Sequence, residues 1–139
     1  MAFDKNYLKE FIAEVPDFPE KGISFKDFTP MLSDKTQCNR LPLYFEEMIL
    51  RNGGVDKFDT IVAVESRGFI LGGMLASHLG KPLVLIRKSG KLPRKKISKS
   101  YSLEYSEAIC EIHCDSIKRG NRVIIVDDLL ATRGTTHAA

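Results

Sequence analysis

The chain has 139 residues, which fits a single domain with one packed core. Hydrophobic residues make up 43% of it, which excludes a disordered chain, and the mild net charge of +3 does not indicate a nucleic-acid protein. Its three cysteines form no CxxC pair, which argues against a zinc site, and no apolar run approaches the roughly 18 residues of a membrane span or forms a signal peptide, so we expect a cytoplasmic protein.

The first part of the chain predicts two helices with an irregular stretch between them. Apolar residues recur at helical spacing between residues 7 and 15, which predicts a short amphipathic helix that prolines then end. Residues 20–33 are expected to be irregular. A second helix is expected to run to Asn52, where two glycines form a stop signal, and Pro42 leaves its first residue open.

The second part alternates between buried strands and helices. The apolar runs at 59–64, 83–86 and 122–126 predict buried strands, and residues 68–79 predict a helix between the first two. Short apolar runs separated in this way indicate parallel strands that are covered on both faces. Residues 107–114 alternate in polarity and predict a half-exposed antiparallel strand.

Polar loops follow each predicted parallel strand. In open α/β sheets, ligands bind beyond the carboxyl ends of the strands. The segments at that edge are residues 65–68, the stretch from Arg87 onward, and residues 127–135. We therefore look for the chemistry of this protein in these loops.

The most informative string is VIIVDDLLATRGT, residues 123–135. A turn rich in small and hydroxyl residues, opening a helix, can direct backbone N–H groups and hydroxyls at a phosphate. Asp127 and Asp128 would repel a phosphate, but they can accept hydrogen bonds from sugar hydroxyls or stabilise positive charge on a ribose. For the aspartates alone, an acidic loop before an ordinary helix cap is the better interpretation. The whole string favours a phosphorylated sugar as ligand.

This string resembles the motif with which type I phosphoribosyltransferases bind 5-phosphoribosyl-1-pyrophosphate (PRPP). The resemblance implies an α/β fold with a mainly parallel twisted sheet, flanking helices, and a small hood with a flexible loop. It also implies that Asp127 and Asp128 contact the ribose hydroxyls. The residues expected to hold the 5-phosphate are Ala131, Thr132, Arg133, Gly134 and Thr135.

The segment Glu65-Ser66-Arg67-Gly68 follows the first parallel strand. Arg67 and exposed N–H groups suit a second anion, and Gly68 permits a close approach. The resemblance implies that Glu65, Ser66 and Arg67 form the pyrophosphate loop, with a cis peptide between Glu65 and Ser66. A simple capped turn is the alternative, and would be preferred without the downstream motif.

A basic stretch without acidic residues covers positions 87–99. Alone it would indicate solvated surface or a nucleic-acid patch. The strings IRKSGKLP and YSLEY resemble the adenine-specific enzymes, in which this segment is a mobile hood. The resemblance implies that Arg87, Lys88 and Lys91 bind pyrophosphate and that Glu104 is the catalytic residue that handles a proton near the purine.

The N-terminal string VPDFPEKGISFKDFTP also resembles the adenine enzymes. It implies that Phe25 and Leu129 stack on the two faces of adenine, while backbone groups of Ser24 and Lys26 contact the edge of the base. Core packing of Phe25 is the alternative. The family usually has arginine at the position of Lys26.

The implied reaction is adenine plus PRPP giving AMP plus pyrophosphate. Mg²⁺ is expected to bridge substrate oxygens, with no direct protein ligand. Relatives are commonly homodimers, and neither nucleic acid nor membrane is an expected partner. The alternatives are a non-catalytic PRPP or nucleotide-binding protein, specificity for hypoxanthine or guanine, and, weakest, a nucleic-acid binder.

The chain departs from the family pattern in two places. Arg133 stands where the family has glycine, so we expect weakened PRPP binding. The chain stops at Ala139, whereas relatives continue through a helix and at least one further strand. The domain, residues 1–139, is therefore expected to be incomplete at its C-terminus, with low stability and weak or absent turnover.

Overall fold

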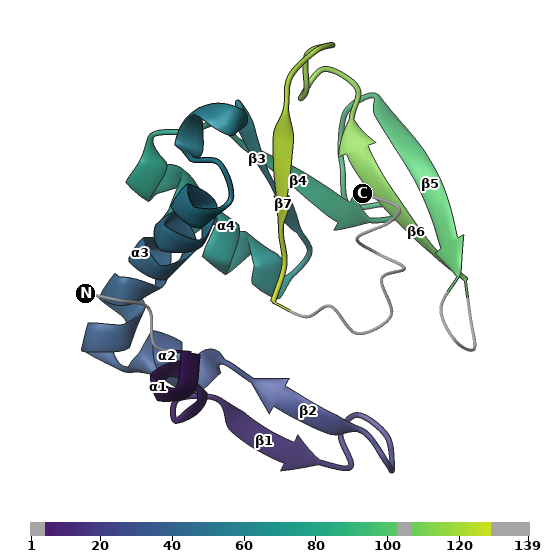
Figure 1. Cartoon of the computed structure of the whole chain (residues 1–139). Coiled ribbons are helices and arrows are strands. Elements are labelled where there is room, and N and C mark those ends of the chain that lie inside the picture. Colours follow the sequence, from purple (N-terminus) through teal and green to yellow (C-terminus); the bar gives the residue numbers. More distant parts are fainter. Residues whose placement is uncertain (1–4, 103–106, 129–139) are drawn as a thin grey trace. The chain divides into compact units, whose positions relative to one another are not determined.

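The structure is a computed structural model that describes residues 5–102 and 107–128 (Figure 1). The chain divides into two compact units, Met1–Met48 and Ile49–Ala139. The expected single domain stays a prediction. Among the described residues, no helix is both long enough and apolar enough to cross a membrane.

The first unit holds a β-hairpin between short helices. Its elements are α1 (Lys5–Lys9), β1 (Ala13–Pro16), β2 (Ser24–Asp27), α2 (Thr29–Ser33) and the start of α3 (Lys35–Arg51). The helix predicted over residues 7–15 is wrong beyond Lys9. Residues 13–16 instead form the first strand of the hairpin, with Val15 opposite Phe25. Proline is acceptable at the edge of a sheet, whereas within a helix it removes a hydrogen bond.

Residues 20–33 are not irregular as predicted, because they contain β2 and α2. Asp27 joins these elements, since one carboxylate oxygen accepts the Thr29 N–H at 2.9 Å and the other accepts the Thr29 hydroxyl at 2.8 Å. Pro30 then lies in the first turn of α2, where no intrahelical donor is needed. The predicted stop of the long helix is confirmed: α3 ends at Arg51 and contains Pro42.

The second unit is built on a sheet that has five strands among the described residues, in the order β5-β6-β4-β3-β7. The strands β3, β4 and β7 are parallel, as predicted, and β6 is antiparallel to β4. The bounds are β3 (Thr60–Val64), β4 (Leu83–Lys88), β5 (Lys96–Ser102), β6 (Glu107–His113) and β7 (Val123–Val126), with a 3-10 turn η1 (Val55–Lys57) before β3.

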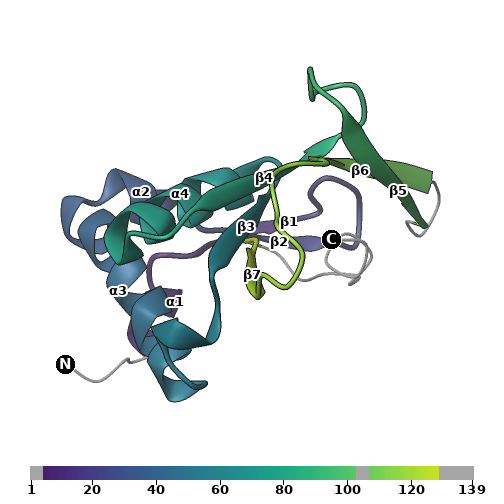
Figure 2. The same ribbon diagram turned by 90° about the horizontal axis from the view of Figure 1, so that it is seen from above.

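The basic stretch predicted as a loop is partly a strand. Residues from Lys96 onward form β5, which pairs with β6 along its whole length, from Lys96 opposite His113 to Ser102 opposite Glu107. No clear alternation of polarity predicts β5, because lysines and serines occupy five of its seven positions. Figures 1 and 2 show this hairpin as the end of the sheet beyond β4.

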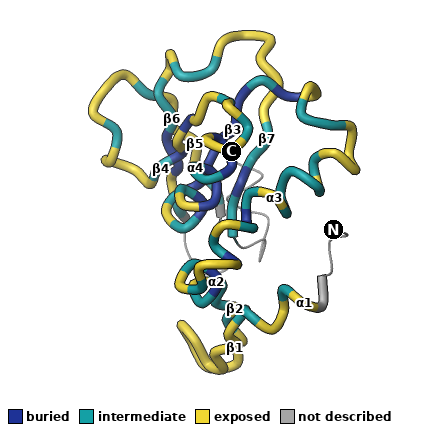
Figure 3. The backbone as a smooth tube through the Cα atoms, turned by 90° about the vertical axis from the view of Figure 1, so that its left-hand side faces the viewer, coloured by how far each residue is buried: buried dark blue, intermediate teal, exposed yellow. Residues whose placement is uncertain are grey.

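The helix α4 (Arg67–Leu79) packs against β3 and β4, and Figure 3 shows the buried residues gathered along the sheet and this helix. Gly72 permits the contact, because a Cβ atom there would lie 2.6 Å from the Cβ of Ala63. Every residue of β3 is buried, as expected for a central parallel strand. The helix ends at Gly80, whose φ of 63° is the left-handed conformation that favours glycine.

The hairpin β5–β6 is joined to the parallel strands by an apolar cluster. Val62, Val84, Ile86 and Cys110 are buried in it. The partly buried residues that pack against it include Tyr101 from β5 and Ile125 from β7. This packing holds the hairpin in place beside the parallel strands β3, β4 and β7.

Candidate functional site

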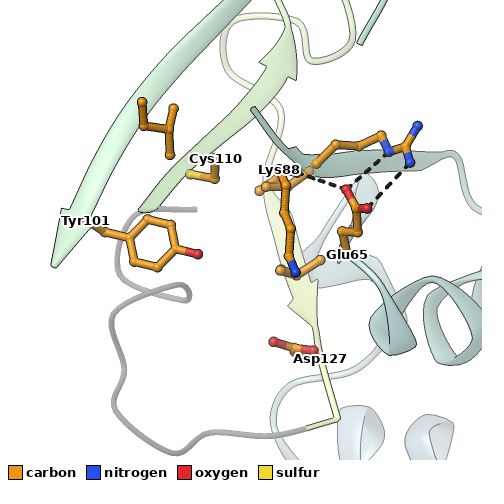
Figure 4. Close-up of a pocket in the computed structure, with 9 residues that line it drawn as sticks. Glu65, Lys88, Tyr101, Cys110 and Asp127 are labelled. Carbon is orange, nitrogen blue, oxygen red and sulfur yellow. Dashed lines mark hydrogen bonds and ion pairs between the residues drawn. The ribbon is translucent and has the colours of Figure 1, made fainter. Parts of the chain in front are cut away.

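The carboxyl ends of three parallel strands meet at one edge of the sheet. Val64 lies opposite Ile86, and Ala63 lies opposite Val126. The next residues, Glu65, Arg87 and Asp127, are therefore brought together. A pocket of about 130 Å³ opens there (Figure 4). It is lined by Val64, Glu65, Ile86, Arg87, Lys88, Tyr101, Ile109, Cys110 and Asp127.

Glu65 fixes the start of the basic stretch. Its carboxylate accepts hydrogen bonds from Arg87 Nε at 3.2 Å and Nη2 at 3.5 Å, and from the Lys88 N–H at 2.9 Å. Partial burial opposes ionisation, but these donors outweigh it and hold the pKa of Glu65 below its ordinary value. Glu65 therefore orients Arg87, and its place in a pyrophosphate loop stays a prediction.

The turn from β3 into α4 has the predicted backbone. The peptide bond between Glu65 and Ser66 is cis. Gly68 allows a close approach, as expected, but the group that approaches is the end of β7. A Cβ atom at Gly68 would lie 2.8 Å from the Val126 carbonyl oxygen and 3.2 Å from Asp127 Oδ1. Any larger residue at this position would displace the acidic pair.

Arg67 and Asp128 form an ion pair across this junction. Arg67 Nε lies 2.5 Å from Asp128 Oδ2, and the side chain of Asp128 is only 7% exposed. A carboxylate buried to that extent requires a partner, and Arg67, which is 40% exposed, provides it while remaining in contact with solvent. Arg67, which is predicted to bind pyrophosphate, is thus held by Asp128, which is predicted to bind ribose.

Asp127 has a different environment from its neighbour. It lines the pocket and accepts the Asp128 N–H at 2.9 Å. Burial, which penalises the charged form, and the adjacent Asp128 carboxylate raise the pKa of Asp127 to about 6. The pair therefore combines one carboxylate neutralised by arginine with one whose charge depends on pH near neutrality.

Lys88 and Tyr101 face each other across the pocket. Figure 4 shows the Lys88 side chain extended into it on the side of Asp127, and the Tyr101 hydroxyl directed inward from β5. Cys110 lies beside them, and burial raises the pKa of its thiol, which keeps it protonated and apolar. Tyr101 was missed as a pocket residue, because no pattern in residues 96–102 predicts the strand that carries it.

Three of the four predicted adenine residues, Ser24, Phe25 and Lys26, lie on β2 in the first unit. Phe25 is partly exposed, and its ring contacts Phe18 edge-to-face with the centroids 5.4 Å apart. Glu14 pairs with Lys26 and accepts the Ser24 hydroxyl. Phe25 is thus not a buried core residue of this unit, which leaves part of its ring accessible. Its role in binding adenine stays a prediction.

Several predicted site residues lie outside the described residues. They are Glu104, Leu129, Ala131, Thr132, Arg133, Gly134 and Thr135. Within residues 5–102 and 107–128, no group of three or more His, Cys, Asp or Glu side chains is placed to hold a metal ion.

Comparisons with known proteins agree with this geometry. Residues 46–139 match the family model described as "Phosphoribosyl transferase domain". The chain is 50% identical over 132 residues to the adenine phosphoribosyltransferase of Agathobacter rectalis, which covers 95% of this chain and 74% of that protein.

Solved structures give the same result. The adenine phosphoribosyltransferase of Thermoanaerobacter pseudethanolicus superposes with a TM-score of 0.87 at 48% identity, covering 96% of this chain and 75% of that one. The Saccharomyces cerevisiae enzyme, complexed with adenine and D-2,5-dideoxy-2,5-imino-altritol 1,6-bisphosphate, gives 0.91 at 38% identity, covering 96% of this chain and 76% of that one. The predicted α/β fold is therefore confirmed.

Proposed function

Since the chain belongs to the phosphoribosyltransferase family, we propose that it transfers the phosphoribosyl group of PRPP to adenine, giving AMP and pyrophosphate. One observation in particular supports this: the acidic pair, the Arg67 turn and the basic stretch from Arg87 meet at one edge of the sheet. A ligand with sugar hydroxyls at its centre and anionic groups at its ends fits this arrangement, because the hydroxyls can meet the acidic pair and the anionic groups can meet the basic residues. The relatives described above are named adenine phosphoribosyltransferases, which supports adenine as the base.

The chain's residues act mainly by positioning. Asp127 accepts hydrogen bonds from the ribose hydroxyls and stabilises the positive charge that grows on the sugar as its bond to pyrophosphate lengthens. Lys88 and Lys91 bind the departing anion. Glu104 takes or shares the proton of the attacking purine, while Phe25 and Leu129 hold the ring between them. Ala131 to Thr135 bind the 5-phosphate, and Ser24 and Lys26 contact the edge of the base.

The chain's residues fit a magnesium ion that enters with PRPP. Mg²⁺ usually keeps several waters and binds through one or two carboxylates and substrate phosphates, so an all-protein cage is not needed. Asp127 remains available beside the pocket, whereas Asp128 is already neutralised by Arg67. When bound, the ion neutralises the leaving pyrophosphate.

Assembly and location follow from the same proposal. We expect a homodimer in the cytoplasm, as is common in this family, with no nucleic-acid or membrane partner. Sedimentation of the purified chain would determine its assembly state. A mass near the 15.6 kDa of one chain would contradict the dimer.

The direct test is incubation of the purified chain with adenine, PRPP and Mg²⁺, with AMP measured by chromatography. AMP should form with adenine and not with hypoxanthine or guanine at equal concentration. The matched control is Asp127→Asn, which keeps the shape of the side chain and removes its charge. Binding of PRPP without AMP formation would replace the proposal by a non-catalytic PRPP-binding protein.

A further inference from the structure

The basic turn between β4 and β5 is held by two carboxylates from opposite sides. Glu65 binds its start, through Arg87 and the Lys88 N–H. Arg87 Nη1 in turn donates to the Lys91 carbonyl oxygen at 3.2 Å. The other carboxylate is Glu111 on β6, which no pattern in the sequence singles out.

Glu111 is buried and receives donors on both oxygens. Its side chain is 4% exposed, and Lys96 Nζ lies 2.8 Å from Oε2. Oε2 also accepts the Gly90 N–H at 3.0 Å. Oε1 accepts the Ser98 hydroxyl at 3.2 Å and the Ser89 hydroxyl at 3.3 Å. The hydrogen bond from Lys96 outweighs burial and holds the pKa of Glu111 below its ordinary value, so the group is ionised at neutral pH.

These contacts fix the backbone of the turn. Gly90 has φ of 80°, the left-handed conformation, which aims its N–H at Glu111. The Ser89 N–H donates to the Ile109 carbonyl oxygen at 3.1 Å on the same strand as Glu111. Residues 88–91 are therefore attached to β6 by backbone and side-chain bonds together, and do not form a loose surface loop.

Within the part of the chain that the structure describes, the side chains of the two lysines in the turn are left without a bonded partner. Among the described residues, neither Lys88 nor Lys91 makes a side-chain ion pair or hydrogen bond. Lys88 lies opposite Cys110, and Arg87 lies opposite Glu111. Lys88 and Cys110 both line the pocket, whereas Glu111 is not among the residues that line it. The charge of Glu111 thus supports the turn without neutralising the lysine in the pocket.

We propose that Glu111 is a positioning residue that preorganises the turn of residues 88–91 as a clamp for the pyrophosphate group. The inference deepens the proposed function and rests on it for the identity of the ligand. Its physical basis is that a turn whose backbone is already fixed does not have to lose its conformational freedom when the anion binds. Glu111 does not touch the anion itself.

The test compares three variants with the wild-type chain. Glu111→Ala removes all the acceptors, and Glu111→Gln keeps one oxygen for the Gly90 N–H while losing the charge. Asp115→Asn is the matched control, because it also removes one negative charge from this region, but Asp115 is 65% exposed and pairs with Arg94, outside residues 88–91. The probe is magnesium pyrophosphate, and its dissociation constant is measured by calorimetry.

We expect Glu111→Ala to bind magnesium pyrophosphate about tenfold more weakly than wild type, with Glu111→Gln intermediate and Asp115→Asn unchanged. Amide hydrogen exchange separates positioning from loss of fold. The Gly90 amide should exchange faster in Glu111→Ala, while the amides of β3 keep their protection.

Three results would overturn the inference: equal affinity in Glu111→Ala, equal weakening in Asp115→Asn, or a matching loss of protection in β3. A wild-type chain that fails to bind magnesium pyrophosphate would also overturn it. A chain that binds the anion with this dependence on Glu111 but makes no AMP would contradict the proposed function alone.

Discussion

Arg67 and Asp128 join segments that lie 61 residues apart in the sequence, because Nε of one donates to Oδ2 of the other at 2.5 Å. Through this bond the first turn of α4 is attached to the end of β7. The position of the acidic pair therefore depends on the turn after β3, and both belong to the same site.

Removing either partner of this ion pair should destabilise the chain, but by different amounts. Arg67→Gln leaves the buried carboxylate of Asp128 without its partner, so we expect a loss of about 2 kcal/mol, reduced from the buried-pair range because Arg67 is partly exposed. Asp128→Asn should cost less, since it removes the buried charge. Urea unfolding of both single variants and the double variant gives the coupling energy, and strictly additive losses would mean that the pair contributes nothing.

The affinity for PRPP should depend on pH through Asp127. Its pKa of about 6 lies above the ordinary 3.8, so the folded chain binds this proton more tightly than the unfolded chain. The group's contribution to stability is therefore lost as pH rises from about 4 through 6. The ionised form is the one that accepts both ribose hydroxyls, so PRPP binding should weaken about tenfold between pH 7 and pH 5.

The control for this pH profile is Asp127→Asn, which cannot ionise. PRPP's own phosphates titrate in the same range and affect both proteins equally. The difference between the two calorimetric profiles isolates Asp127. Parallel profiles would assign the whole pH dependence to the ligand.

Two adjacent glycines of α4 should respond differently to alanine. Gly72→Ala places a Cβ atom 2.6 Å from Ala63, and this overpacking should cost about 1–3 kcal/mol. At Gly73 nothing lies within 4 Å of the added atom, so Gly73→Ala should stabilise by up to about 1 kcal/mol through helix propensity. Thermal melts of the two variants should therefore shift in opposite directions, and shifts of the same sign would refute the packing argument.

Glu104 is the predicted catalytic residue, and Glu104→Gln should lower the rate of AMP formation by about 10²–10³. Its affinity for PRPP should stay close to that of wild type, because the proposed contact is with the purine. Rate and affinity are measured on the same preparation. An unchanged rate would remove the assigned role.

Arg133 replaces the glycine that the family has in its phosphate loop. Arg133→Gly should tighten PRPP binding, because glycine removes a side chain from the phosphate site and tolerates left-handed backbone, which costs other residues about 1–2 kcal/mol. A PRPP titration of both proteins measures the change. Equal dissociation constants would show the arginine to be harmless.

Much of the second unit could be predicted from the sequence. The apolar runs of β3, β4 and β7 and the glycines that bound α4 are local signals, since burial on both faces and left-handed turns each demand particular residues. The motifs also placed Asp127, Arg67 and Arg87 correctly at one edge. The cis bond after Glu65 came from family resemblance.

The tertiary structure decided what each charge contacts. Residues 13–16 became a strand because a partner strand was available at residues 24–27, and β5 became one because β6 lies beside it. No pattern in the sequence shows which donor contacts each of the carboxylates Glu65, Asp128 and Glu111. Their donors come from elements that meet only in the folded sheet. Sequence by itself determined which groups reach the edge of the sheet. Long-range pairing decided which of them are neutralised and which remain available to a ligand.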